Sequence, residues 1–448
     1  MSRRIKQRRH PAACHQRADT IFSPLTLTLT LSVFGAMLCT PVSAAEPLSS
    51  VFSLHGFGTL GVVGSNEDQA DVVSNAYRQP DGAGYTNIWS AGVDSKLGAQ
   101  VDARISADLS GVVQVVSKRG HDGSWTPGVE WANVKYQPQP GLALRVGRTV
   151  SPTFMLSDTA NVGYANPWVR GPQEVYGMVP ITYLDGVDLT WNTGFGEATN
   201  AFQASFGGNT FDAVDDTEIS GDRTWIFSNT IEYDAFAMRL GYLSVDLTFD
   251  SAELDRLFGG FSALGATLST AGATTSGQLA SALADRYAVD DTRLEMISLG
   301  TRYAPGNWLF LGEWARISEA GLLPRTTGWY ATAGYRMRKV MPYVTYATLD
   351  SEARSPSGVP LADVPGDLRP AAAELNAALA AALQASAPAQ DSIALGVRWE
   401  VLDSAALKFE YQHIDIGDRS AGRLGNVQPG FEPGGEVDLL SVTFDFVF

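Results

Sequence analysis

The chain has few of the residues on which thiol, disulfide and metal chemistry depends. Both of its cysteines, Cys14 and Cys39, lie within the first 44 residues, and only three of its five histidines lie beyond them. Without that segment the chain has no cysteine, which excludes disulfide scaffolding, thiol catalysis and cysteine-based metal sites. No GxSxG, HExxH or phosphate-loop pattern occurs either. The sequence therefore predicts no metal site, no cofactor and no enzyme activity.

Long apolar runs are also missing beyond residue 44, so we expect no membrane-spanning helix there. The first 44 residues have a basic opening segment, an apolar stretch over 21–39, and the small-x-small sequence Val42-Ser43-Ala44. This order is typical of a Sec-type signal peptide that is cleaved near Ala44. The expected organisation is a signal peptide over residues 1–44 and a single domain over residues 45–448.

Positive charge is scarce. Removal of the predicted signal peptide takes away six basic residues and one acid, which leaves 26 bases against 47 acids and a net charge of −21. Binding to phosphate backbones needs a basic footprint. We therefore expect no nucleic-acid partner.

Glycine and aromatic residues are plentiful, with 45 glycines and 10% aromatics, and apolar residues alternate with polar ones. In the last segment Leu440, Val442 and Phe444 share one face, and Ser441 and Thr443 share the other. A period of two is typical of strands between lipid and a polar lumen. About sixteen such segments occur. We place them at 51–64, 93–105, 110–119, 129–137, 142–150, 187–193, 200–208, 224–233, 236–246, 293–304, 308–318, 326–336, 340–349, 391–400, 405–416 and 436–448.

The connections between these segments alternate in length. Short links such as 106–109, 138–141 and 337–339 take turns with long ones such as 65–92, 247–292 and 350–390. Short turns at one end and long loops at the other are typical of a closed, even-stranded outer-membrane barrel. The sequence thus predicts an all-β transmembrane antiparallel barrel with long extracellular loops.

Two further patterns refine this barrel. Aromatic residues gather near the predicted strand ends on the short-turn side, as an interfacial girdle would require. Residues 251–285 and 371–387 have apolar residues at helical spacing within two long loops. These loops are either low-complexity surface segments or short helices laid over the barrel mouth.

Several stretches resemble the outer-membrane porins of Gram-negative bacteria. They are VEWANVKY (129–136), LRVGR (144–148), SPTFMLSDTANVGYANPWVRGPQEVYGMVP (151–180) and the last strand, which ends in Phe448. The resemblance implies a Gram-negative outer-membrane location, a homotrimer, contact with lipid and lipopolysaccharide, and insertion by the barrel-assembly machinery, which reads Phe448. It also implies that the third long loop, 151–186, folds inward and narrows the pore. That loop is rich in proline and aromatic residues, and the charged residues considered there are Asp158, Arg170, Glu174 and Asp185.

The alternation also predicts which charges point into the lumen. A charge that faces lipid at mid-membrane costs roughly 2–4 kcal/mol, so strand charges should point inward. The residues expected to line the pore are Lys96, Arg104, Lys118, Lys135, Arg145, Arg239, Glu313, Arg336, Arg398, Lys408 and Glu410. Most acids lie in the outer loops instead, so a basic lumen is expected to favour small hydrophilic solutes that are anionic or neutral.

Three other functions remain open, one of which is a structural or adhesion barrel with a closed lumen that would show no conductance. The proline-rich and aromatic third loop, together with a basic wall, would also suit a substrate-specific channel for small organic acids. An outer-membrane enzyme is the weaker alternative, because its best candidate pair, His413 and Asp415, resembles a solvated contact at the barrel rim.

Overall fold

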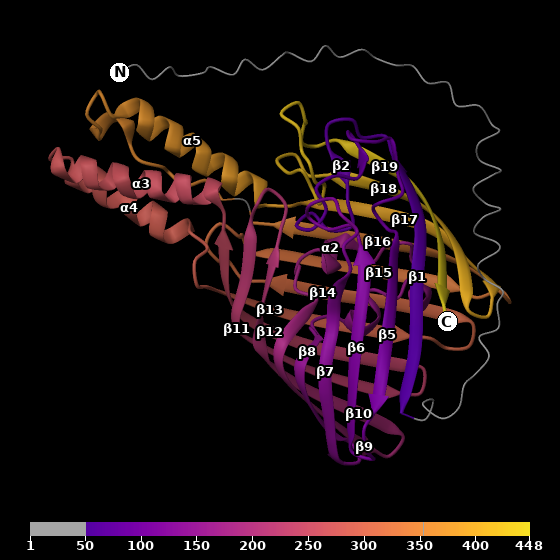
Figure 1. The fold of residues 1–448 in the computed structure, drawn as a ribbon. Helices are drawn as coiled ribbons and strands as arrows, with labels where there is room; N and C mark the ends of the chain where they lie inside the picture. The colour runs from indigo at the N-terminus through magenta and orange to yellow at the C-terminus, as the bar shows by residue number, and fades with distance from the viewer. Residues whose placement is uncertain (1–50, 353) are drawn as a thin grey trace, which may run out of the picture. The chain divides into compact units, whose positions relative to one another are not determined.

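The computed structural model describes residues 51–352 and 354–448, and the predicted signal peptide lies outside them. The main sheet closes on itself (Figure 1). β1 (Phe52–Ser65) pairs antiparallel with both β5 (Lys96–Arg104) and the last strand, β19 (Glu436–Val447). The two-residue β4 (Trp89–Ser90) is a short addition beside β1. Without β4, sixteen of the sheet's 17 strands form the barrel wall.

Every predicted strand is present. The other wall strands are β6 (Leu109–Lys118), β7 (Gly128–Gln139), β8 (Leu142–Val150), β9 (Tyr183–Phe195), β10 (Ala198–Asp212), β11 (Glu218–Tyr233), β12 (Phe236–Asp250), β13 (Thr292–Tyr303), β14 (Trp308–Ile317), β15 (Thr326–Tyr335), β16 (Val340–Ser351), β17 (Gln390–Leu402) and β18 (Ala405–Ile416). β10 and β11 are longer than expected and leave only residues 213–217 between them. The first long loop also contains a small ladder of β2 (Asp71–Val72) and β3 (Ala83–Gly84).

Loop length follows strand parity as predicted. The seven turns at one end, from 105–108 to 403–404, have at most four residues each. The opposite end carries long connections such as 66–95, 251–291 and 352–389. The outward side chains form an apolar surface, with Leu240, for example, 53% exposed. Since lipid is the solvent that suits such a surface, the closed barrel is built to span a membrane.

Aromatic residues mark both edges of this apolar surface. On the short-turn side Trp308 and Tyr335 are exposed, with ring centroids 4.8 Å apart. Towards the long loops, Phe206 and Trp225 lie 4.4 Å apart. Trp and Tyr rings prefer the level of the lipid headgroups, so the positions of Trp308 and Tyr335 agree with the girdle predicted on the short-turn side.

Three glycines lie side by side across β8, β9 and β10. Gly147 pairs with Gly186, and Gly186 pairs with Gly207. A Cβ atom on Gly186 would lie 2.1 Å from the carbonyl oxygen of Phe206 and 2.7 Å from the Cα of Gly207. Such contacts are shorter than any side chain tolerates, so the strands approach this closely only because these positions lack side chains.

We expect Gly186→Val to impair closure of the barrel between β9 and β10. The valine methyl groups would overlap backbone atoms, and overpacking costs about 1–3 kcal/mol or more. Refolding into detergent, followed by heat-modifiable migration in gels, measures the folded fraction. Gly194→Val on the same strand is the matched control, because a Cβ atom there meets no atom within 4 Å. Equal folded fractions for the two variants would contradict this account.

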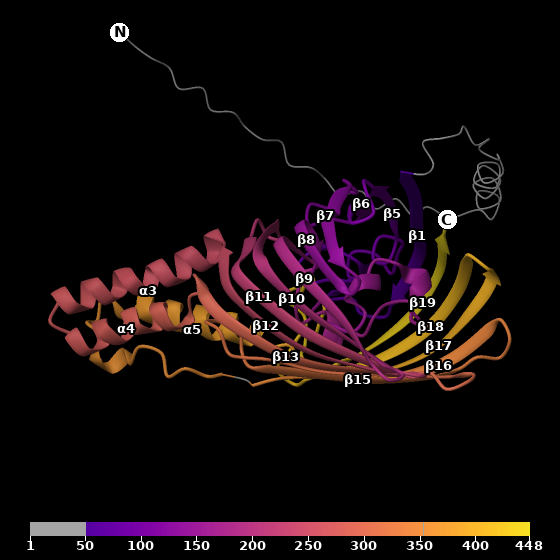
Figure 2. The same cartoon turned by 90° about the horizontal axis from the view of Figure 1, so that it is seen from below.

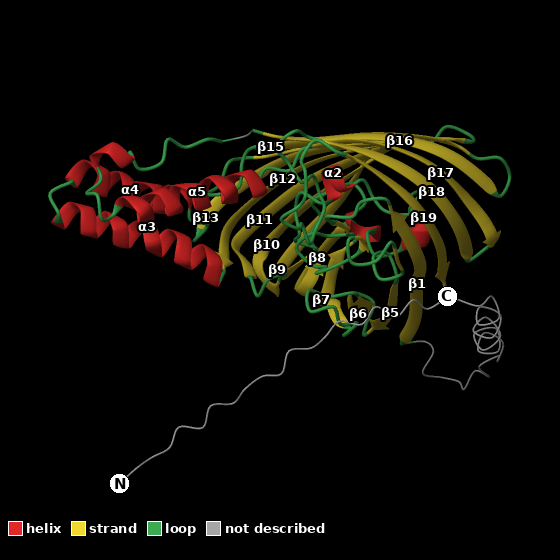
Figure 3. Ribbon diagram, turned by 90° about the horizontal axis from the view of Figure 1, so that it is seen from above, coloured by secondary structure: helices red, strands yellow, loops and turns green. Residues whose placement is uncertain are grey.

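Both predicted helical loops contain helices. The first forms α3 (Ala252–Thr270) and α4 (Thr274–Tyr287), and the second forms η4 (Leu361–Asp363) and α5 (Arg369–Ala385). None of the helices in the described residues is long and apolar enough to cross a bilayer. Figures 2 and 3 show α3, α4 and α5 together, projecting from the barrel rim. Of the two alternatives, the position over the mouth is not the one found: the segments are helical, as the second alternative held, but their apolar faces pack largely against one another beside the rim.

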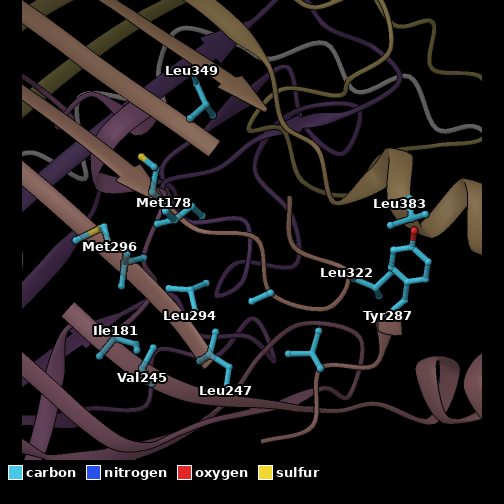
Figure 4. Close-up of a cluster of buried hydrophobic side chains, with 14 of the residues drawn as sticks. Met178, Ile181, Val245, Leu247, Tyr287, Leu294, Met296, Leu322, Leu349 and Leu383 are labelled. Atoms are coloured by element: carbon cyan, nitrogen blue, oxygen red, sulfur yellow. The ribbon is translucent and has the colours of Figure 1, made fainter. Parts of the chain in front are cut away.

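The core lies inside one half of the barrel. Inward side chains of β11 to β16 form an apolar wall at the long-loop end, and side chains of the third long loop pack on it. Figure 4 shows Val245 and Leu247 of β12 beside Leu294 of β13 and Ile181 of the loop. This cluster continues to Tyr287 of α4 and Leu383 of α5. The lumen is thus asymmetric, with packed apolar residues on one side and polar residues on the other.

Candidate functional site: the constriction

The third long loop folds into the barrel, as the sequence predicted. It spans residues 151–182, here called the constriction loop, and contains η2 (Ser157–Thr159), η3 (Gly163–Ala165) and α2 (Gln173–Tyr176). Asp185 was expected in this loop, but it lies on β9, where it pairs with Arg148 of β8 at 2.6 Å. β8 ends at Val150 as predicted, but β9 begins at Tyr183, four residues earlier than expected, so the loop ends earlier than expected.

Lys408 holds the middle of the constriction loop. Its side chain is fully buried, and its Nζ donates hydrogen bonds to the carbonyl oxygens of Gly163 at 2.8 Å and Trp168 at 2.6 Å. Asp445 of β19 lies 2.9 Å from the same nitrogen. One ammonium group therefore joins the backbone of the loop to a buried carboxylate of the wall.

Two arginines hold the loop in the same way. Arg398 of β17 donates to the carbonyl oxygens of Tyr164 at 2.5 Å and Asn166 at 2.9 Å. Its guanidinium also lies over the Tyr164 ring, 4.7 Å from the centroid. Arg239 of β12 donates to the carbonyl oxygen of Phe154 at 2.8 Å. Arg239, Arg398 and Lys408 were expected to line the pore, and the structure places their polar atoms against the loop backbone.

Buried carboxylates fix the remaining parts of the loop. Glu313 of β14 accepts hydrogen bonds from the backbone N–H of Met155 at 2.8 Å and from the hydroxyls of Tyr330 and Tyr176. Glu174, within the loop, accepts from Gln390 and Ser392 of β17, each at 2.7 Å. Burial, together with the Glu313 charge, raises the pKa of Tyr176 well above its ordinary value. Tyr176 therefore stays neutral and keeps its proton for this hydrogen bond.

Arg170 closes the loop against the first long loop. Its guanidinium makes a bidentate contact with Asp94, at 2.8 and 2.7 Å, and both side chains are buried. Burial alone would lower the pKa of Arg170, but the charge and hydrogen bonds of Asp94 raise it above the ordinary value. Glu410 of β18 accepts from Tyr343 at 2.6 Å nearby. Breaking such a buried pair leaves an uncompensated charge, so the contact is held firmly.

A cavity of about 220 Å³ separates the constriction loop from the wall of β5, β6 and β7. The charged residues that line it are Arg78, Asp94, Lys96, Lys118, Arg119, Glu130 and Arg170. Lys118 pairs with Glu130 at 2.6 Å, and Arg119 pairs with Asp81 at 2.6 Å. Among the described residues, Arg78 and Lys96 have no carboxylate within 4.0 Å. The cavity therefore has an excess of positive charge.

A second cavity, of about 380 Å³, lies toward the short-turn end. Its charged lining consists of Arg302, Arg336 and Arg398, with no acid among the lining residues. Glu400 lies beside it and pairs with Arg336 at 2.5 Å. Leu156 of the constriction loop lines both cavities. Positive charge thus extends from the constriction cavity to this second cavity, here called the inner vestibule.

The other predicted pore residues lie apart from the constriction. Arg145 of β8 pairs with the buried Asp188 of β9 at 2.5 Å. Lys135 pairs with Arg145 in the ladder and so shares its inward face. Arg104 ends β5 and is exposed near the short turn 105–108.

Two further predicted residues have other positions. Asp158 lies within the constriction loop, 3.8 Å from Arg239. Phe448 is 69% exposed and exchanges backbone hydrogen bonds with Gly56.

Sequence reasoning missed Arg78, Arg119 and Glu130. Arg78 lies in the long loop 66–95, where alternation gives no orientation. Arg119 was placed in the predicted strand 110–119, on the face opposite to Lys118, but β6 ends at Lys118 and Arg119 begins the following loop. Glu130 is displaced by a β-bulge opposite Gln114 and Val115. As a result both Glu130 and its neighbour Trp131 line a cavity of about 110 Å³ behind the loop. A strict period of two cannot place two consecutive residues on one face.

His413 and Asp415 lie on the outer face of β18, which they share with the exposed Phe409 and Tyr411. His413 contacts Asp438 at 2.8 Å and Asp415 at 3.5 Å. The side-chain atoms of His413, Asp415 and Glu436 that could bind a metal ion lie within 4.8 Å of one another. No hydroxyl nucleophile is hydrogen-bonded to His413 in the described residues. This group is therefore separated from both lumen cavities by the barrel wall.

No protein-family model matches the chain, and no curated protein sequence matches it. Solved structures do. The anion-selective porin from Comamonas acidovorans aligns with a TM-score of 0.51 and 13% identity, over 89% of this chain and 99% of that one. OmpF of Salmonella typhi, in complex with daunomycin, aligns with a TM-score of 0.51 and 12% identity, over 89% and 97%. At this identity the likeness concerns the fold, and it confirms the predicted porin-like barrel with an inward-folded third loop. Together with the apolar outer surface, this fold agrees with the predicted outer-membrane location.

Proposed function

We propose that this porin-fold barrel is a passive outer-membrane channel for small hydrophilic solutes, and that it favours anionic and neutral ones. The observation that supports this most directly is the charge of the constriction cavity. Five basic side chains line it against two acidic ones, and Arg78 and Lys96 have no carboxylate within 4.0 Å among residues 51–352 and 354–448. A low-dielectric surround focuses the field of such charges, so anions gather at the narrowest point and cations are repelled.

The net charge of the whole chain does not oppose this proposal. Acids of the long loops, such as Asp215 and Asp291, lie away from the constriction. Charges that are exposed to water are screened within about 10 Å at 0.1 M salt. The cations that a solute passes at close range therefore dominate its electrostatic energy in the pore.

The proposal includes the remaining expectations from the sequence. Residues 1–44 direct export and are removed, Phe448 is read by the assembly machinery, and the barrel is a homotrimer surrounded by lipid and lipopolysaccharide. We propose a channel without catalytic activity, because the only histidine group singled out as a catalytic candidate lies on the barrel exterior.

Reversal potentials in planar bilayers under a KCl gradient test this function. We expect ohmic conductance with a potential of the sign produced by chloride permeation, because unpaired cations line the constriction. Clear cation preference would contradict the selectivity, and the absence of conductance would contradict the channel itself. Purified protein that cleaves ester or peptide substrates would favour the enzyme alternative.

A further inference from the structure

The lumen of this barrel departs from the polar lining that its alternation leads one to expect. At the long-loop end the inward residues of β12, β13 and β14 are apolar, among them Val245, Leu294 and Ile317. Such a wall does not assist the diffusion of small hydrophilic solutes, because contact with apolar side chains does not stabilise them. Much of the wall is covered by the constriction loop through Met178 and Ile181 (Figure 4).

The covering is incomplete. A cavity of about 50 Å³ remains between the wall and the loop segment that contains Pro180. One water needs roughly 10–15 Å³ of such space, so the cavity has room for several waters or for a short apolar group. Pro324 and Pro388 of two long loops line its outer side. Pro180 also lines the cationic cavity, so the two spaces share one residue of the constriction loop.

One cation lines this apolar cavity. Arg423 belongs to the loop between β18 and β19, and its buried Nε has no hydrogen-bond partner in the described residues. Burial lowers the pKa of Arg423, whereas the charge and hydrogen bond of Tyr77 and the charge of Glu174 act to raise it. No carboxylate of the described residues lies within 4.0 Å of its guanidinium. Arg423 is partly exposed while its Nε is buried and has no partner in the described residues, so an anionic ligand that reaches the guanidinium would complete its hydrogen bonds.

We propose that this cavity is a binding site for amphipathic monocarboxylates, whose carboxylate contacts Arg423 while the apolar body lies against Val245, Leu294 and Ile317. The anionic head follows from the guanidinium, which matches a carboxylate in charge and geometry. The apolar body follows from the wall, against which buried CH₂ groups are stabilised by leaving water. The site rests on the proposed channel, because a bound acid lies next to the cationic constriction and enters it past Pro180.

Two measurements on the purified full-length barrel test the site. Isothermal titration calorimetry in detergent measures binding of butyrate, whose propyl group is short enough for this cavity, and planar bilayers measure how this acid, added on the long-loop side, reduces the chloride current. We expect saturable binding and a saturable current reduction. Acetate has the carboxylate with almost no apolar body, and 1-butanol has the body without the charge, so both should have little effect at the same concentration.

Variants separate this site from the constriction. Arg423→Gln should weaken binding roughly tenfold or more, because a charge-assisted contact is lost. Arg419→Gln, an exposed position in the same loop, is the matched control and should bind normally. Val245→Phe fills the cavity without a change of charge and should also abolish binding. Lys96→Gln should alter ion selectivity and leave calorimetric binding intact.

The outcomes distinguish the site from the channel. Binding that depends on Arg423 and Val245 in a barrel without conductance would overturn the proposed channel and retain the site. Conductance without binding of butyrate would overturn the site and retain the channel. Binding that survives both Arg423→Gln and Val245→Phe but is lost in Lys96→Gln would place the acid at the constriction, and it too would overturn the proposed site.

Discussion

Lys408→Met is expected to increase single-channel conductance and to destabilise the barrel. Methionine retains the length of the side chain but loses both hydrogen bonds to the constriction loop, at Gly163 and Trp168. It also leaves Asp445 buried without its cation. Loss of one partner of a buried pair costs about 3–5 kcal/mol. The loop should therefore lose its central attachment and move toward the opposite wall or out of the lumen.

Single-channel recording and thermal unfolding in detergent measure the two effects separately. The double variant Lys408→Met with Asp445→Asn removes the uncompensated charge, so it should regain most of the lost stability. It does not restore the donors to the loop backbone, so its conductance should remain high. An unchanged conductance in well-folded Lys408→Met would show that Lys408 does not position the loop.

Replacement of Arg78 and Lys96 by glutamate is expected to reverse the ion selectivity. The two side chains are the cations of the constriction cavity that have no carboxylate within 4.0 Å in the described part of the chain. The double variant changes the charge of the cavity by four units while the ion pairs that hold the loop stay in place. Fields in a low-dielectric cleft alter local ion concentrations by about tenfold or more, so the permeability ratio should change at least that much.

The reversal potential under a KCl gradient reports this change directly. Arg104→Glu provides a control in which the charge of one strand residue is reversed at the short-turn end, outside the cavities described above. It should shift the potential only slightly. A double variant that keeps the wild-type sign would show that selectivity arises elsewhere, with the arginines of the inner vestibule as the next candidates.

The barrel could be predicted from the sequence because two independent regularities coincide. Alternation fixed the faces of strands such as β5 and β18, and loop-length parity fixed their direction. Both are local properties, set by the need to satisfy every backbone group in lipid. The inward third loop came from resemblance; its start at residue 151 was predicted correctly, but its end was misjudged because β9 begins as early as Tyr183.

The roles of the charged residues could not be predicted in the same way. Alternation gives the direction of Arg398 and Lys408, but only the folded loop shows that their polar atoms contact its carbonyl oxygens. Glu130 was missed because a bulge interrupts the period of two. The apolar wall around Val245 and Leu294 follows the alternation in orientation but contradicts it in polarity. It was therefore not recognised as part of the lumen.

The attachment of the constriction loop affects how the selectivity of the proposed channel can evolve. Arg239, Arg398 and Lys408 hold backbone carbonyl oxygens, which every amino acid supplies. Side chains of the loop and of the facing wall can thus be exchanged while the loop keeps its path. Single substitutions can therefore change the selectivity while the pore remains. Homologues with the same three attachments and different cavity residues are expected to conduct different solutes through the same scaffold.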